Sequence, residues 1–258
     1  MLFDIRGRRK HVVRVVYAIL ALLMGASLFL VVGPFNIANV INTGSSTSAA
    51  EISQEQAEKI EAKLRREPDN PVLLVSLTRK RINAGNALTE TNTATGFVEL
   101  LPEGRQELEQ AGAAWQRYLK EENPPKASAA AQMARAYFTL AENSFGLTET
   151  VANVEKAAAT QDLAATGQPT INSLTTLAIY KYYAGDFAAG DKAARQAEAK
   201  APTKAQAKQV KEQMGEARAR GTQFAKQKKE FAKTEKEQGK EALKNPFGEL
   251  GGSPSLGQ

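Results

Sequence analysis

Apolar residues recur at helical spacing over most of the chain, and turn-forming residues divide this pattern into short segments. Between residues 51 and 202 the apolar positions repeat every three or four residues, which is the spacing of one face of an α-helix. Prolines, glycines and Asp-Asn or Gly-Asp pairs interrupt the pattern at positions typical of turns. The pattern therefore predicts an all-α body.

The interruptions predict seven helices followed by one longer helix. The first begins near Ser53, its expected N-cap, and ends before Pro68. The second is expected to end at Gly85, and the Thr-rich residues 87–102 are expected to be irregular. After the first, the expected helices cover residues 71–84, 103–121, 127–142, 148–165, 170–184, 187–200 and 203–244.

The segment from Val15 to Gly33 differs from the rest because its 19 residues carry no charge. At about 1.5 Å per residue, a helix of this length nearly crosses a hydrocarbon core of about 30 Å. With Pro34 and Phe35 added, we predict a single transmembrane helix over residues 15–35. A cleaved signal peptide is the alternative, but its apolar region is usually shorter, about 7 to 15 residues.

The charges on either side of this segment predict its orientation. Residues 1–14 carry a net charge of +4, whereas residues 34–50 carry none. The positive-inside rule places the N-terminus in the cytoplasm and the body on the far side of the inner or plasma membrane. Residues 36–50 are small and polar, so we expect a flexible linker there. The orienting residues are Arg6, Arg8, Arg9, Lys10 and Arg14.

The segment from Ile171 to Pro202 carries a bulky, bulky, small pattern in its first helix, a Gly-Asp-aromatic turn and a closing proline. The matching positions are Leu174, Leu177, Ala178, Gly185, Asp186, Phe187, Ala194, Ala197 and Pro202. This segment resembles a tetratricopeptide repeat, whose period is about 34 residues. Lys181 and Gly190 depart from the usual pattern. The resemblance, fainter before residue 170, implies that residues 51–202 form a TPR-like α-solenoid.

The long C-terminal helix expected over residues 203–244 combines charges with an apolar seam. The seam residues, at spacings of 4, 3, 4, 3 and 7, are Val210, Met214, Ala217, Gly221, Phe224 and Phe231. Such a heptad-like seam indicates packing on another helix. We interpret its first half as the polar-faced helix that caps a solenoid. A coiled-coil partner helix and a free solvated helix are the alternatives, and residues 245–258 are expected to be disordered.

The composition excludes several kinds of chemistry. The chain has no Cys, and its single histidine, His11, lies in the basic tail, so no disulfide, thiolate zinc site or His-based triad can form. No P-loop or hydrolase motif occurs. The net charge of +6 comes from the two ends, because residues 15–202 carry −3 and residues 203–258 carry +5. We therefore predict no enzyme activity, no cofactor, no metal and no nucleic-acid partner.

Two functions from different classes remain. The resemblance implies a scaffold that binds protein or peptide clients in a groove, with Tyr137, Tyr180 and Lys181 on inner helices as candidate contacts. In layout the chain resembles membrane-anchored bacterial periplasmic proteins that assist secreted clients. The alternative is a structural envelope protein whose basic C-terminal tail binds anionic cell-wall polymer or lipid. In either case the transmembrane helix or the tail helix could join copies into a homo-oligomer.

Overall fold

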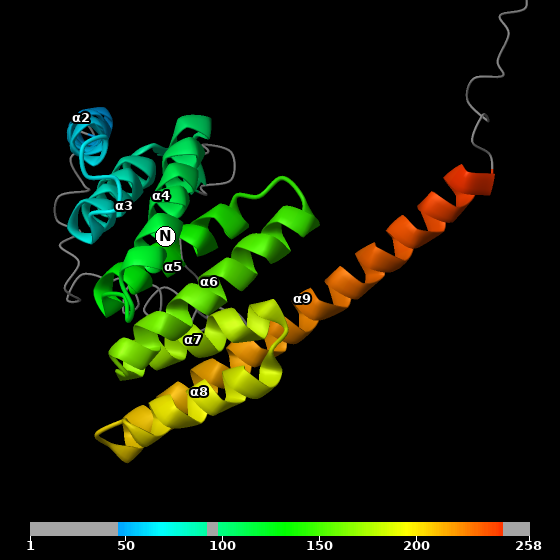
Figure 1. Ribbon diagram of the computed structural model, residues 1–258. Coiled ribbons are helices and arrows are strands. Elements are labelled where there is room, and N and C mark those ends of the chain that lie inside the picture. Colours follow the sequence, from blue (N-terminus) through cyan, green and yellow to red (C-terminus); the bar gives the residue numbers. More distant parts are fainter. Residues whose placement is uncertain (1–45, 92–97, 245–258) are drawn as a thin grey trace, which may run out of the picture. The chain divides into compact units, whose positions relative to one another are not determined.

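A computed structural model describes residues 46–91 and 98–244 of the chain. The chain divides into two units, Met1–Ala49 and Ala50–Gln258, and almost all of the described residues belong to the second. Helices make up most of this unit (Figure 1), which confirms the all-α prediction. The helices are α2 (Ser46–Leu64), α3 (Pro71–Ala87), α4 (Pro102–Glu121), α5 (Ala127–Glu142), α6 (Leu147–Gly167), α7 (Ile171–Ala184), α8 (Phe187–Ala199) and α9 (Lys204–Lys244).

None of the helices within residues 46–91 and 98–244 is long and apolar enough to cross a membrane. The predicted transmembrane helix, residues 15–35, lies outside the described residues, and so does the disordered end expected over residues 245–258. The membrane anchor therefore stays a prediction. The same holds for the orientation that it takes from Arg6, Arg8, Arg9, Lys10 and Arg14.

Helix boundaries follow the predicted breaks closely, except at the start of the body. α5 covers the predicted residues 127–142. α2 begins at Ser46 rather than near Ser53, so the end of the predicted flexible linker is helical. Ala50, within that linker, is buried. Small residues allow this turn of helix to pack against its neighbours, which is why the polar composition alone misplaced the boundary.

A short β-hairpin separates α3 from α4. Its strands, β1 (Thr89–Thr91) and β2 (Val98–Leu100), pair antiparallel, with Thr89 opposite Leu100. The prediction of irregular structure over residues 87–102 is therefore wrong for these residues. β-branched Thr and Val favour the extended backbone. The Leu100 N–H also donates a hydrogen bond of 3.0 Å to the Asn143 side-chain oxygen, which holds β2 against the end of α5.

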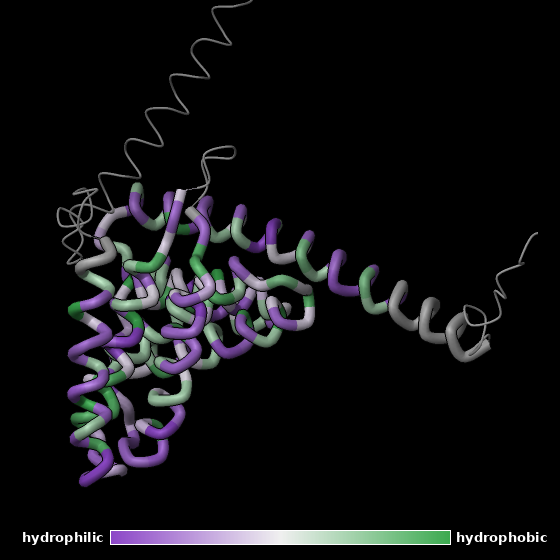
Figure 2. The backbone as a smooth tube through the Cα atoms, turned by 90° about the horizontal axis from the view of Figure 1, so that it is seen from above, coloured by the Kyte–Doolittle hydropathy of each residue, from purple (hydrophilic) through white to green (hydrophobic). Residues whose placement is uncertain are grey.

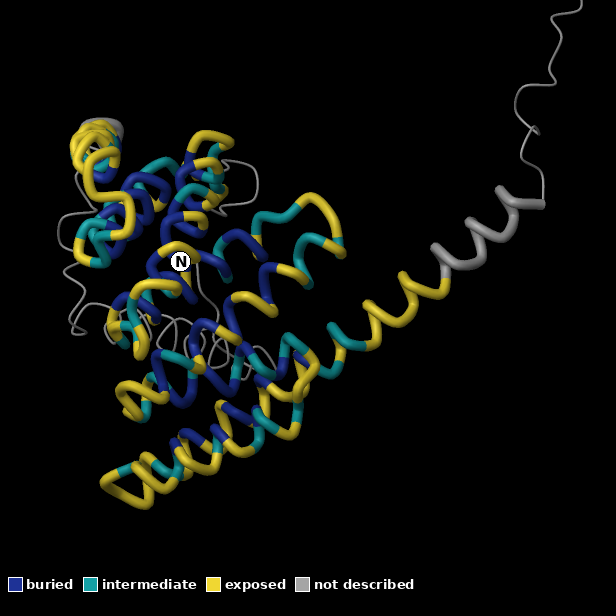
Figure 3. Tube along the Cα trace, viewed as in Figure 1, coloured by how far each residue is buried: buried dark blue, intermediate teal, exposed yellow. Residues whose placement is uncertain are grey.

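The helices pack as a succession of neighbouring pairs (Figure 1). α3 packs on α4, α5 on α6 and α7 on α8, and the pairs are joined by contacts of α5 with α3 and α4 and of α6 with α7. Each helix carries both hydrophobic and hydrophilic positions, as expected of helices with one buried face (Figure 2). The buried residues lie where the helices face one another (Figure 3). α9 completes the succession by packing on both α7 and α8.

Small residues set the spacing between these helices. Of the 22 buried residues in the larger core cluster, ten are alanine. Gly85 was predicted to end its helix, but α3 continues through it to Ala87. A Cβ on Gly85 would lie 2.6 Å from Cδ2 of Leu108 and 2.8 Å from the Gly104 carbonyl oxygen. Glycine is therefore required there for the close approach of α3 and α4. A glycine inside a helix lowers the stability of that helix only modestly.

A buried ion pair joins the first three described helices. Arg81 of α3 donates to Glu107 of α4 at 2.8 Å, and both side chains are less than a tenth exposed. The same guanidinium donates to Glu61 of α2 at 2.7 Å, and Gln54 of α2 donates to Glu107 at 2.9 Å. Burying charges is tolerated here because each one is paired and hydrogen-bonded.

The first half of α9 packs as a capping helix does. Val210, Met214 and Ala217 are buried with residues of α7 and α8. At Gly221 the crossing with α7 is so close that a Cβ would lie 2.7 Å from the Tyr182 carbonyl oxygen. Figure 3 shows the exposure of α9 increasing along its length. Phe231, the last residue of the predicted seam, is 43% exposed.

The two glycines of α9 whose surroundings are described give the first prediction. Gly221→Ala should destabilise the folded unit by about 1–3 kcal/mol, because the added methyl meets rigid backbone of α7. Gly215→Ala is the matched control, since a Cβ there meets nothing within 4 Å. It should stabilise the same helix by roughly 0.5–1 kcal/mol. Urea unfolding of residues 46–258 measures both; equal effects of the two substitutions would contradict the packing of α9 on α7.

The buried ion pair gives the second prediction. Glu107→Gln should destabilise the unit by about 3–5 kcal/mol, because the buried Arg81 guanidinium then loses its only buried anionic partner among the described residues. The control is Glu55→Gln, which breaks an exposed pair with Lys59 and should cost less than about 0.5 kcal/mol. Thermal unfolding followed by circular dichroism measures the difference. A Glu107→Gln protein as stable as the control variant would show that the network does not hold α2, α3 and α4 together.

Candidate functional site

An open groove lies between α4, α5 and α6, and it is the first candidate binding site. Its volume is about 420 Å³. Tyr137 and Leu140 of α5 lie in it between residues of α4 and α6. Because the neighbouring positions on these two helices are mostly small or polar, space remains between them. The complete lining is Glu109, Gly112, Ala113, Gln116, Tyr137, Leu140, Glu149, Ala152, Asn153 and Lys156, and we call this the Tyr137 groove.

Tyr137 forms a fixed part of this groove. Only 4% of the residue is exposed. A Cβ on Gly112 would lie 3.1 Å from the Tyr137 hydroxyl oxygen, so glycine leaves room for the phenol under α4. Burial raises the pKa of Tyr137, and a hydrogen bond with the Gln116 side chain offsets this in part. The phenol therefore stays neutral at physiological pH.

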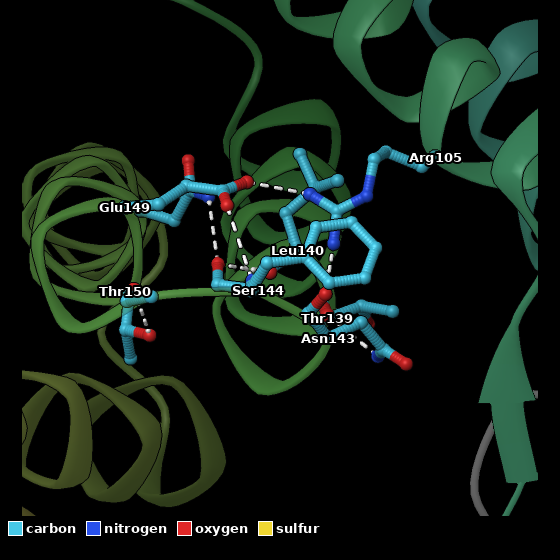
Figure 4. A network of polar contacts seen from close by, with 10 residues as sticks. Arg105, Thr139, Leu140, Asn143, Ser144, Glu149 and Thr150 are labelled. Carbon is cyan, nitrogen blue, oxygen red and sulfur yellow. Dashed lines mark hydrogen bonds and ion pairs between the residues drawn. The ribbon is translucent and has the colours of Figure 1, made fainter. Parts of the chain in front are cut away.

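Charged side chains lie at two places on the lining of the groove, one beside Tyr137 and one at the turn between α5 and α6. The Lys156 ammonium lies 5.8 Å from the centroid of the Tyr137 ring, which is a cation–π distance. Glu149, elsewhere on the lining, is paired with Arg105 of α4. Arg105 also donates to the Asn143 backbone carbonyl, as Figure 4 shows. These bonds fix the turn between α5 and α6, so one part of the groove has a rigid polar wall.

Phe145 in the same turn is unusual because it is 92% exposed. The Arg105 guanidinium carbon lies 4.7 Å from its ring centroid. This stacking places an aromatic ring beside the Arg105–Glu149 pair. A large exposed aromatic side chain next to a groove is a common feature of binding surfaces.

A second groove lies one helix pair further along, at the N-terminal half of its first helix, whereas Tyr137 and Leu140 lie in the C-terminal half of theirs. It lies between α6, α7 and α8 and has a volume of about 450 Å³. As in the Tyr137 groove, the first helix of a pair lies between its own partner and the second helix of the preceding pair. The lining residues are Asp162, Ala165, Thr166, Pro169, Leu174, Leu177, Gln196, Ala199 and Lys200, and we call this the Leu174 groove.

The structure separates the three residues predicted to contact a client. Tyr137 lines a groove, but Tyr180 and Lys181 line neither of the two. Tyr180 is only 7% exposed and stacks on Phe138 of α5, with ring centroids 4.5 Å apart. Lys181 has its ammonium 3.7 Å from the Asp186 carboxylate, across the turn between α7 and α8. Tyr180 is therefore a packing residue, and the idea that these three side chains share one groove is not supported.

Sequence reasoning did not single out Gly112, Lys156 or the α5–α6 turn. A glycine inside the otherwise helical pattern of residues 103–121 was the available signal for close packing at Gly112. Among the described residues, no group of three or more His, Cys, Asp or Glu side chains is placed to hold a metal ion.

Tyr180 gives the third prediction, on pH dependence. Burial raises its pKa to about 12. Of the smaller effects, the positive charge of Arg135 lowers the pKa and the negative charge of Glu142 raises it. Since the unfolded value is about 10, the neutral phenol stabilises the fold fully below pH ~10, and this contribution is lost as the pH rises through 12. Tyrosinate absorbance should show late titration, coupled to loss of helical signal. Tyr180→Phe should remove one late-titrating group; an unchanged titration curve would contradict the buried position.

No protein-family model matches the chain, and no match was found among curated proteins or solved structures. The groove residues and their surroundings therefore carry the functional interpretation by themselves.

Proposed function

We propose that this protein is a membrane-anchored scaffold whose helical body lies outside the cytoplasm and binds segments of client proteins. The observation that carries the proposal is that two successive helix pairs each form an open groove with the helix that precedes them. The Tyr137 and Leu174 grooves have similar volumes, about 420 and 450 Å³. Repeated helix pairs commonly present extended binding surfaces of this kind.

Part of the helix packing supports this proposal. α3 contacts α5 and α7 contacts α9, as first helices of successive pairs do in stacked repeats, whereas the backbones of α5 and α7 do not approach each other in this way. The segment that most resembles a tetratricopeptide repeat forms α7 and α8. Its turn has Gly185 at φ 87°, a left-handed conformation that favours glycine, and Asp186 caps α8 by accepting from the Ala189 N–H.

The groove lining indicates the kind of segment that would fit. Gly112, Ala113 and Ala152 leave space for side chains of a client between α4 and α6. Glu109 and Lys156 supply opposite charges on the same lining. A client segment with small apolar residues between polar or charged ones would match this surface. The proposal assigns no catalytic step to any of these residues.

Filling the groove gives the fourth prediction. Ala113→Trp places a large side chain in the Tyr137 groove from an exposed position, so the core is left intact. Ala131→Trp on α5 is the control, because Ala131 is also exposed but does not line either groove. The full chain is crosslinked in cells and purified through an affinity tag. We expect a stoichiometric client protein with the wild type and the control, and at least about a tenfold loss with Ala113→Trp, a change of about 1.4 kcal/mol.

Two results would count against this proposal. One is the same client recovered equally well with Ala113→Trp, which would place the binding surface elsewhere. The other is the absence of any stoichiometric client under crosslinking in repeated experiments. Circular dichroism of each purified variant shows whether the folded body is retained, so that a loss of binding is not confused with unfolding.

A further inference from the structure

The basic residues of α9 lie in a stripe along one face of the helix. The stripe begins in the half of α9 that packs on α7 and α8 and continues beyond it. The described members recur at spacings of 4, 3, 7, 8, 3 and 4 residues, which keeps them on one side of an α-helix. They are Lys204, Lys208, Lys211, Arg218, Lys226, Lys229 and Lys233, and we call this set the basic stripe.

The stripe lies beside the buried face of α9. At 3.6 residues per turn, its centre is roughly a third of a turn around the helix from the buried residues Val210, Met214 and Ala217. All seven members of the stripe are exposed. The side chain of Lys208 is 78% exposed, and that of Arg218 is 51% exposed although it pairs with Asp191. α9 thus uses one face for packing and presents an adjacent, basic face to its surroundings.

Acidic residues do not cancel this charge. Residues 204–233 contain nine basic and three acidic side chains. Glu212 and Glu216 pair with Lys208 and Arg220 on the flank of the stripe. The excess of positive charge therefore remains on the basic face, where it produces a field that favours an extended anionic surface.

The body holds the stripe in place beyond the packed half of α9. Phe224 meets Tyr183 of α7 with ring centroids 6.0 Å apart. The Lys228 ammonium lies 3.7 Å from the Glu155 carboxylate of α6. A basic segment that is already helical loses less conformational freedom on binding an anionic surface than an unstructured basic segment does.

We propose that the basic stripe of α9 binds the anionic phospholipid headgroups of the membrane in which the chain is anchored. The inference rests on the proposed membrane anchor. Only ten residues, 36–45, separate the predicted transmembrane helix from the start of α2, and ten residues span at most about 36 Å. α9, with 41 residues, is about 60 Å long. A helix of this length offers several lysines at once to headgroups, each of which strengthens binding by roughly fivefold.

Vesicle binding of residues 46–258 tests this inference. This fragment contains both core clusters of the described residues, and circular dichroism confirms its folding before use. The probes are vesicles of phosphatidylcholine alone and vesicles of equal parts phosphatidylcholine and phosphatidylglycerol. We expect binding only to the anionic vesicles and a steep loss of binding as salt is added, because salt screens exposed charges.

Two variants that each lose three positive charges test whether the basic stripe is the binding surface. Lys226→Gln, Lys229→Gln and Lys233→Gln together should weaken binding by more than about tenfold. The control removes three exposed basic residues outside α9, with Lys63→Gln, Arg65→Gln and Arg66→Gln, and should bind nearly as the wild type. Equal loss in both variants would mean that binding follows net charge alone, and unchanged binding in the α9 variant would refute the stripe.

Other outcomes also decide the inference. Equal binding to neutral and anionic vesicles would overturn it. If soluble polyphosphate displaces the protein completely at the same phosphate concentration, the stripe is a general polyanion site and the assignment to a bilayer is wrong. Failure of vesicle binding with intact client capture would refute only this inference. Loss of client capture with normal vesicle binding would refute only the proposed scaffold function.

Discussion

Close approach of helix backbones is the constraint on which the rest of this structure depends. The body buries few large side chains for its size and relies on alanine and glycine at the helix contacts. Gly85 brings α3 against α4, and Gly221 brings α9 against α7. Each small side chain buries less hydrophobic area than a large one, but it allows neighbouring backbones to pack densely. Aromatic residues such as Trp115 and Tyr118 then fill the gaps that remain.

The grooves follow from the same constraint. Where small residues on α4 and α6 face each other across α5, no large side chain fills the space, and the Tyr137 groove stays open. The Leu174 groove forms in the same way one helix pair later. The small residues that let the helices pack closely therefore also leave the grooves open. The proposed scaffold function uses this space, and the proposed lipid contact uses the basic stripe of α9.

Much of the fold could be predicted from the sequence because its signals are local. The double proline before α5 and the Gly-Asp turn before α8 mark helix ends wherever the chain folds. Gly85 shows the limit of this reasoning. Glycine ends a helix in one context and allows two helices to touch in another, and only the neighbour, here Leu108, decides between them. The start of α2 at Ser46 was missed for a similar reason, since its polar composition suggested a linker.

The candidate site was harder to predict than the helices. Tyr137 was expected in a groove and lines one, but Tyr180, with the same chemistry on the next pair, stacks on Phe138 in the core. Helical periodicity cannot distinguish these positions, because both lie on the partly apolar face of a helix. The groove itself is left open by small residues on α4 and α6, and a sequence shows these only as a few unremarkable alanines and a glycine.

Hydrogen exchange along the backbone of residues 46–258 tests the central claim most directly. If close packing of helix pairs holds the body together, amides of α3 to α8 should exchange slowly as one cooperative unit. Protection in α9 should be strong through Gly221, which touches α7, and should fall after Phe224. Helices that exchange independently at different rates, or equal protection of α9 up to Lys233, would contradict the account.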